Sequence, residues 1–221
     1  MSYLLDKTNW NYSDTTSIPY LLVQHIYITG ISLLIALLIA IPIGLIVARY
    51  QRLYLPVITI AGLIYTIPSL AAGVILLPYT GLNANTIIIP LIAYAQLVLI
   101  RNMVTAIRSV DQNLIDIGRA MGMNWWQLQT RIIIPLALPV IIAGVRVAAV
   151  TTIGIASIGS LIGANDLGDL IFDGIQLGPK HASEIYAGAI LITLLALSVD
   201  LILLGVQRVL NRGRGAIAAA S

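Results

Sequence analysis

Hydrophobic residues along this chain fall in long runs that charged residues do not interrupt. One run, residues 53–100, reaches Arg101 without a charged side chain. Because a helix needs about 20 apolar residues to cross a bilayer, this run suits two crossings joined by a short turn. Pro78 and Gly81 place that turn within residues 77–86. We therefore predict five spans, at about residues 26–48, 54–77, 86–105, 136–162 and 184–207. Four spans should be kinked by an internal proline, at Pro42, Pro68, Pro90 and Pro139.

Composition supports an all-α membrane protein. Of the 221 residues, 59% are hydrophobic and only 10% are charged, and the mean hydropathy is +0.96. A water-soluble domain needs more charge to cover its surface. The absence of cysteine excludes disulfides and thiolate metal sites. His25 and His181 lie far apart in sequence and show no metal-ligand spacing.

The distribution of Lys and Arg predicts the topology. With the N-terminus outside, nine basic residues fall on the inner face: Arg49, Arg52, Arg101, Arg108, Arg119, Arg131, Arg208, Arg212 and Arg214. Only Lys7 and Lys180 then fall outside. Residues 1–20 lack the basic start of a signal peptide, and the following apolar run is too long for one, so we expect a retained anchor.

These features predict three regions. Residues 1–20 form an external N-terminal segment, and residues 211–221 form a cytoplasmic tail. Residues 21–210 form the transmembrane domain, with an inner loop at 109–135 and an outer loop at 164–183.

The chain contains no phosphate-cradling G-x-x-x-x-G-K-[ST] loop, no nucleophile elbow and no HExxH motif. We therefore expect no enzymatic activity from it. If transport is driven by ATP, a separate chain must hydrolyse the ATP.

The inner loop, DQNLIDIGRAMGMNWWQLQTRIIIP, should hold two helical pieces. The first ends near Met121, where Gly122 suits a helix break. Asn124 can cap the second piece, which runs towards Pro135. The residues alone leave two interpretations open. The pieces form either a rigid protrusion or an interfacial helix whose tryptophans lie at the lipid headgroups.

This loop resembles the signature E-A-A-x-x-x-G-x9-I-x-L-P of binding-protein-dependent ABC permeases. Asp116, Ile117 and Gly118 stand where that signature has Glu-Ala-Ala, Gly122 matches its glycine, and residues 132–135 match its end. Four further stretches are similar to permeases for glycine betaine, carnitine and choline: YTIPSLAAG (65–73), RNMVTAIR (101–108), PLALPVIIAGVRVAAV (135–150) and GSLIGANDLGDLIFDGI (159–175). The resemblance runs from Leu21 to Leu210.

The resemblance implies a permease subunit with the type I ABC importer fold, in the cytoplasmic membrane of a bacterium or archaeon. The substrate class would be a quaternary ammonium compatible solute. The partners would be an ATP-binding subunit that holds ATP and Mg, an extracytoplasmic solute-binding protein, and a second permease subunit; no nucleic acid is expected. The segment that couples to the ATPase would be Asp116, Ile117, Gly118, Arg119, Ala120, Met121 and Gly122.

Charged and aromatic residues within the spans supply further candidates. An unpaired charge at mid-bilayer is costly, and Arg146 and Asp200 lie at similar depths, so we predict that they pair. The pair either fastens two helices or gates the path. Tyr65 and Tyr94 offer aromatic faces that can attract a quaternary ammonium, although ordinary helix packing would also explain them. We expect the translocation path to be lined by Tyr65, Pro68, Ser69 and Tyr94.

In the outer loop, helical periodicity puts Asp166, Asp169 and Asp173 on one face and Leu167, Leu170, Ile171 and Gly174 on the other. This pattern predicts a short amphipathic helix. Its acidic face is either simply solvated or a docking surface for the binding protein.

Three competing functions remain open. An amino-acid importer, for example for methionine, would share the same inner-loop motif. An ion-coupled carrier could use Arg146 and Asp200 as a relay, but no inverted repeat is apparent. A small membrane-embedded enzyme or assembly factor lacks the clustered His, Asp or Glu that it would need.

Overall fold

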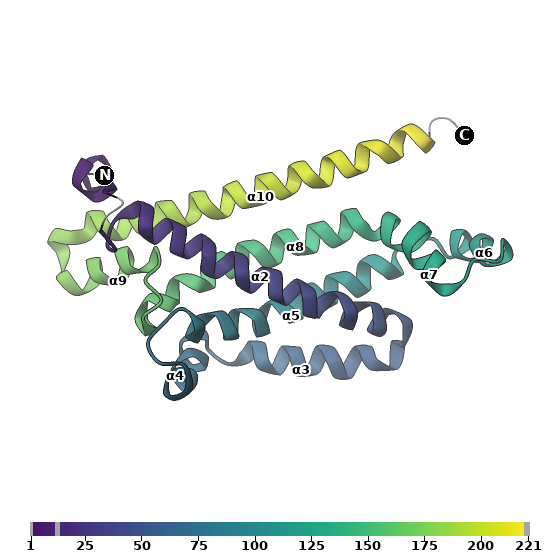
Figure 1. Cartoon of the computed structure of the whole chain (residues 1–221), viewed down its shortest axis with the longest axis horizontal. Coiled ribbons are helices and arrows are strands. Elements are labelled where there is room, and N and C mark those ends of the chain that lie inside the picture. The colour runs from purple at the N-terminus through teal and green to yellow at the C-terminus, as the bar shows by residue number, and fades with distance from the viewer. Residues whose placement is uncertain (1, 12–13, 219–221) are drawn as a thin grey trace.

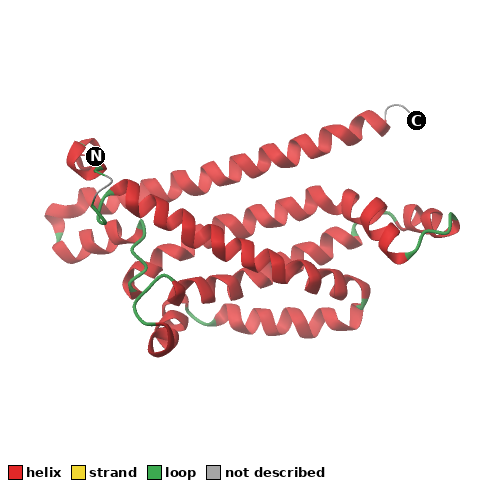
Figure 2. Ribbon diagram, viewed as in Figure 1, coloured by secondary structure: helices red, strands yellow, loops and turns green. Residues whose placement is uncertain are grey.

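The computed structural model describes residues 2–11 and 14–218, and these are helical throughout apart from turns (Figure 2). Figure 1 labels the main helices. The α-helices are α1 (Ser2–Leu5), α2 (Ile18–Arg49), α3 (Tyr54–Thr66), α4 (Ser69–Thr80), α5 (Asn85–Arg108), α6 (Gln112–Ala120), α7 (Trp125–Leu128), α8 (Ile134–Ala156), α9 (Gly168–Leu177) and α10 (Ala182–Ala218). Short 3-10 turns occur at η1 (Lys7–Trp10), η2 (Gln51–Leu53), η4 (Ser157–Ile162) and η5 (Pro179–His181), and a π turn, η3 (Gln129–Ile133), joins α7 to α8.

Four helical stretches of the described residues are long and apolar enough to cross a membrane: Ile18–Arg49, Asn85–Arg108, Trp125–Ile162 and Pro179–Leu210. A fifth candidate is the bent pair Gln51–Thr66 and Ser69–Thr80, whose two arms meet at 85°. Counted as one span, the bent pair brings the total to the predicted five. The two termini accordingly lie at opposite ends of the bundle (Figure 1).

The second span differs from the kinked helix expected over residues 54–77. It breaks at Ile67, whose backbone is extended (φ −68°, ψ 126°), and α4 begins just after Pro68. The proline ring disfavours a helical conformation in the residue before it, which accounts for the break. Pro42, Pro90 and Pro139 lie within α2, α5 and α8, as expected.

The turn between the second and third spans is shorter than expected. Pro78 lies inside α4 and does not end it. The helix continues to Thr80 and stops at Gly81, whose φ of +73° is a conformation that glycine adopts without strain.

The core of the bundle lies where α5 packs between α2 and α8. Small residues dominate this contact, among them Ala36, Ala40, Ala95 and Ala148. At Gly44 and Gly144, even a single added carbon would collide with the facing α5 side chains. Small residues let membrane helices approach closely, and they explain why these three helices form one unit. In contrast, the most apolar stretch of α10 has no fully buried residue, so α10 lies at the edge of the bundle.

The two ends of the bundle carry opposite charge. At one end, termed the basic end, Arg49, Arg108 and Arg119 line one pocket beside α6 and α7. At the other, termed the acidic end, Asp169, Asp173 and Glu184 line a small pocket together with the N-terminal segment. Of the predicted N-terminal segment 1–20, residues 1, 12 and 13 lie outside the described residues, and α2 already starts at Ile18. In the predicted tail 211–221, α10 continues to Ala218 and residues 219–221 lie outside the described residues.

Candidate functional site

The helix within the inner loop ends where the sequence predicts. Helix α6 starts behind the cap residue Asp111, whose carboxylate accepts a hydrogen bond from the Asn113 backbone, and it gives way at Gly122, with φ +77°. Asn124 then starts α7 through a capping box with Gln127. The second piece is not a separate helix, however. It continues through the π turn into α8, so only α6 stands apart from a span.

Helix α6 is held at the basic end by one face and free on the other. Ile115 and Gly118 are buried, and a side chain at Gly118 would collide with Leu128 and Ile132. This tight contact explains the glycine at a position where the family signature has alanine. Figure 1 shows α6 and α7 projecting at the end of the bundle.

The free face of α6 is apolar. Leu114, Ile117 and Met121 are 42%, 57% and 72% exposed, and their spacing places them on one side of the helix. Asp116 forms a surface ion pair with Arg119 at 3.1 Å, which contributes little to stability. Since this face covers nothing within the described chain, it is suited to contact another protein.

Two cation–π contacts join helices at the basic end, the first between α2 and α7 and the second between α5 and α3. The Arg49 guanidinium lies 5.2 Å from the centre of the Trp125 ring, and the Arg108 guanidinium lies 5.2 Å from that of Tyr54. Trp126 remains 65% exposed. Through Arg49 and Trp125, a displacement of α7 would be passed to the end of α2.

The four residues predicted to line the path meet at the break in the second span. The rings of Tyr65 and Tyr94 lie edge to face with centres 5.7 Å apart. The Tyr94 hydroxyl donates a hydrogen bond of 2.8 Å to the carbonyl of Ile67. Tyr65 and Pro68 are exposed, and Ser69 at the start of α4 is half-buried. Tyr94 itself is buried, so it supports the break while Tyr65 faces outwards.

Arg146 and Asp200 form a bidentate ion pair between α8 and α10, with N–O distances of 2.9 and 2.8 Å. Gln207, which sequence reasoning missed, accepts a hydrogen bond from Arg146 and donates one to the carbonyl of Pro139. The sequence feature that could have identified Gln207 is its position two turns after Asp200 on the same helix face. The pair borders an otherwise largely apolar groove of about 720 Å³ between the two helices.

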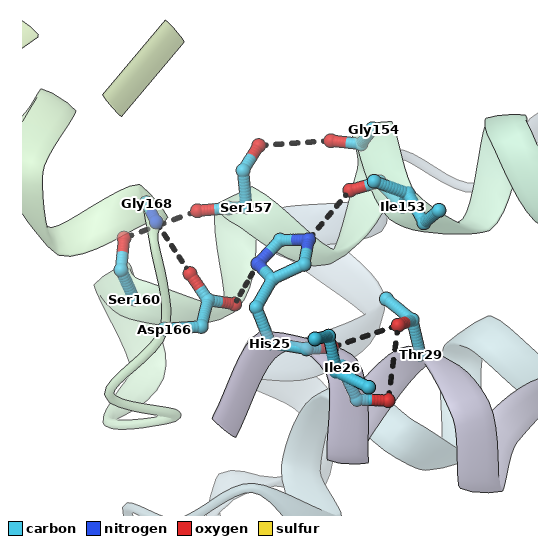
Figure 3. A network of polar contacts seen from close by, with 9 residues as sticks. All are labelled: His25, Ile26, Thr29, Ile153, Gly154, Ser157, Ser160, Asp166 and Gly168. Carbon is cyan, nitrogen blue, oxygen red and sulfur yellow. Dashed lines mark hydrogen bonds and ion pairs between the residues drawn. The ribbon is translucent and has the colours of Figure 1, made fainter. Parts of the chain in front are cut away.

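The expectation for the outer acidic residues is wrong at Asp166. This residue precedes α9, so helical periodicity does not apply to it, and it is fully buried against His25 (Figure 3). The two residues therefore form a second pair of ionisable groups, fully buried where Arg146 and Asp200 are only half-buried. Asp169 is half-buried and Asp173 exposed. Burial, followed by the neighbouring carboxylates of Asp166 and Asp173, raises the pKa of Asp169 to about 7.

Among residues 2–11 and 14–218, no three His, Cys, Asp or Glu side chains come together in a group that could hold a metal ion.

Comparisons with known proteins agree with this geometry. Residues 40–215 match the family described as the binding-protein-dependent transport system inner membrane component. The carnitine transport permease protein OpuCD of Listeria monocytogenes is 42% identical over 188 residues, which cover 85% of this chain and 84% of the relative. The glycine betaine/carnitine/choline transport system permease protein OpuCD of Bacillus subtilis is 39% identical over 188 residues, covering 85% and 82%. The osmoprotectant import permease protein OsmW of Salmonella typhimurium is 35% identical over 214 residues, covering 95% of each chain.

A solved chain of the MetNI methionine ABC transporter, in an inward-facing conformation, has the same fold. It superposes with a TM-score of 0.78 at 23% identity, covering 88% of this chain and 99% of that one. The predicted all-α fold of a type I ABC importer permease is thus confirmed, and the two-helix inner loop falls within the matched region. This chain belongs to the family of binding-protein-dependent transport system inner membrane components, as the motif at residues 116–135 had indicated.

Proposed function

We propose that this chain is the membrane-spanning subunit of an ATP-driven importer for a quaternary ammonium compatible solute such as glycine betaine, carnitine or choline. The named functions of the relatives support this substrate class over an amino acid, because the relatives share up to 42% identity with this chain, whereas the methionine transporter shares 23% and supports the fold alone.

The break in the second span is the observation that best supports a path for solute. Non-helical backbone at membrane depth is tolerated only where protein covers it or where it borders water. Ile67 and Pro68 are exposed in the single subunit, so a water-filled path or a second subunit must meet them. The exposed Tyr65 ring beside the break offers an aromatic face to a passing quaternary ammonium.

The basic end, in this proposal, faces the cytoplasm, following the preference of Lys and Arg for that side. A separate ATPase subunit, which binds ATP and Mg, contacts the exposed face of α6. A solute-binding protein docks at the acidic end. Two permease subunits enclose the path between them, because five spans cannot both line a polar path and shield it from lipid.

Closure of the ATPase subunits on ATP would draw the two α6 helices together. The Arg49–Trp125 contact and the continuous α7–α8 helix would carry this motion into α2 and α8. The path would then open towards the binding protein. The chain itself supplies positioning groups and no reacting group.

Uptake by the reconstituted importer tests the proposal. Proteoliposomes would contain this chain and its ATPase, with the binding protein added outside and ATP enclosed. We expect uptake of radiolabelled choline, carnitine or glycine betaine that requires ATP and survives collapse of ion gradients. Uptake of methionine alone would overturn the substrate class. Uptake that needs an ion gradient and no ATPase would overturn the importer itself.

A further inference from the structure

His25 and Asp166 form a buried polar contact that the proposed transport route does not use. Both side chains have no exposed surface. The His25 Nδ1 and the Asp166 Oδ2 lie 3.6 Å apart, and neither atom has another partner among the described residues. His25 lies two turns inside α2, whereas Asp166 lies in the loop between η4 and α9 (Figure 3).

The hydrogen bond from His25 to Ile153 places one hydrogen on the Nε2 atom. A backbone carbonyl can only accept, so the His25 Nε2 carries a hydrogen that it donates to the carbonyl of Ile153 at 3.1 Å. The Nδ1 therefore faces the carboxylate with either a second hydrogen or a lone pair. Two bare acceptors facing each other in a buried site would be unfavourable, so one proton must lie on the Nδ1 or on the Oδ2. Ile153 belongs to the last turn of α8, so this hydrogen bond joins α2 to the end of α8.

Asp166 also forms hydrogen bonds with the start of the outer helix, α9. Its Oδ1 accepts a hydrogen bond of 2.6 Å from the backbone of Gly168, and its carbonyl accepts one of 2.9 Å from Asp169. These are the first two residues after Leu167, where α9 begins. The side chain of Asp166 thus holds α2 through one oxygen and the start of α9 through the other.

The loop that carries Asp166 also closes the acidic end of the bundle. Ile162 and Ala164 are buried against Ile28 of α2 and Ile87 of α5. Gly163, with φ +83°, leaves no room for a side chain beside the backbone of Leu82. The contact with His25 adds a polar link to this mainly apolar packing.

We propose that His25 and Asp166 are a positioning pair that holds the loop before α9, and α9 itself, in a fixed place relative to α2 and α8. The consequence for transport rests on the proposed function. A fixed α9 presents the acidic end to the binding protein in one orientation, so loss of the pair raises the KM for loaded binding protein more than it lowers the maximal rate.

Substitutions at Asp166 and His25 distinguish loss of the contact between them from a general loss of folding. In Asp166→Asn, the amide oxygen still accepts from Gly168 and the amide nitrogen can donate to the Nδ1 of a neutral His25, so both contacts survive without a carboxylate. In Asp166→Ala, both are lost. His25→Gln keeps a donor for Ile153 but leaves the carboxylate unpaired, and adding Asp166→Asn to it removes that unpaired charge. His181→Gln is the matched control, because His181 also pairs with a carboxylate, Glu184, but at the surface.

Amide hydrogen exchange of the purified, full-length protein measures how firmly α9 is held, and the measurement does not require transport. We expect residues 157–177 to exchange at least tenfold faster in Asp166→Ala and His25→Gln, while α6 is unchanged. Asp166→Asn and His181→Gln should match the unaltered protein, and the double variant should recover part of the protection. The proposal is overturned if Asp166→Ala leaves exchange unchanged, if Asp166→Asn behaves like Asp166→Ala, or if all regions speed up together. Uptake assays then measure the change in KM, and a failure there alone would count against the proposed docking and not against the pair.

Discussion

The hydrogen bond from Tyr94 to the broken second span gives the sharpest test of whether that span borders water. Tyr94→Phe removes one hydroxyl and leaves the ring against Tyr65 in place. A hydrogen bond contributes about 1 kcal/mol net, whereas a carbonyl left without any partner costs about 1–3 kcal/mol. Ile67 is 41% exposed, so in a wet path water can replace the lost hydroxyl. We therefore expect a loss of about 1 kcal/mol in stability.

Thermal unfolding of the purified protein checks this value. For a chain of this size, about 1 kcal/mol corresponds to a fall of about 2–4 °C in the unfolding midpoint. Tyr65→Phe serves as the matched control, because Tyr65 contributes its ring to the same pair while its hydroxyl is not the group that bonds the break. We expect it to stay within about 1 °C of the unaltered protein. A fall in Tyr94→Phe no larger than in the control would show that the bond does not hold the break. A fall beyond about 8 °C would mean a dry, stranded carbonyl and would contradict a water-filled path.

Three further predictions concern the charge pair, the outer acid and the inner helix. Asp200→Ala leaves the Arg146 guanidinium with Gln207 alone, so α10 should detach from α8. Faster cleavage of α10 by a protease added to the purified chain would show this detachment. Unchanged cleavage would argue against a fastening role for the pair. The raised pKa of Asp169 means that the folded protein holds this proton more tightly than the unfolded chain from about pH 4 to 7, so stability should fall as pH rises through that window and level off above it. Asp169→Asn should flatten the dependence of the unfolding midpoint on pH, and an unchanged slope would refute the assignment. Gly118→Leu should displace α6 and abolish copurification of the ATPase, whereas Gly30→Leu, at a glycine with open space around it, should not.

Much of the fold follows from hydrophobic runs and local signals. The length of the apolar runs was enough to count five spans, and Gly122 and Asn124 marked the ends of the two inner helices through their known conformational preferences. Pro68 was recognised as a distortion but not as a complete break. The proline itself disfavours helix at Ile67, and Tyr94, a residue far away in sequence, then donates a hydrogen bond to the carbonyl of Ile67 that the break leaves free. Such a contact cannot be read from the local pattern.

The candidate site could be predicted only in part, again because some of its contacts join residues that are far apart in sequence. Arg146 and Asp200 could be matched by depth, because charges in membrane spans need partners. His25 and Asp166 could not, since one lies near the start of a span and the other in a loop that sequence periodicity assigned to a helix. The apolar run predicts a span from residue 26, which leaves His25 just outside it, whereas α2 begins at Ile18 and includes His25.

Identifying the protein that contacts α6 tests the proposed coupling to the ATPase most directly. A photo-crosslinking amino acid placed at the exposed Ile117 would be activated in membranes that hold the assembled importer. We expect a single product that joins this chain to the ATPase, and a loss of that product when Gly118→Leu displaces α6. A product with the binding protein, or reaction with lipid alone in the assembled complex, would contradict the proposed coupling.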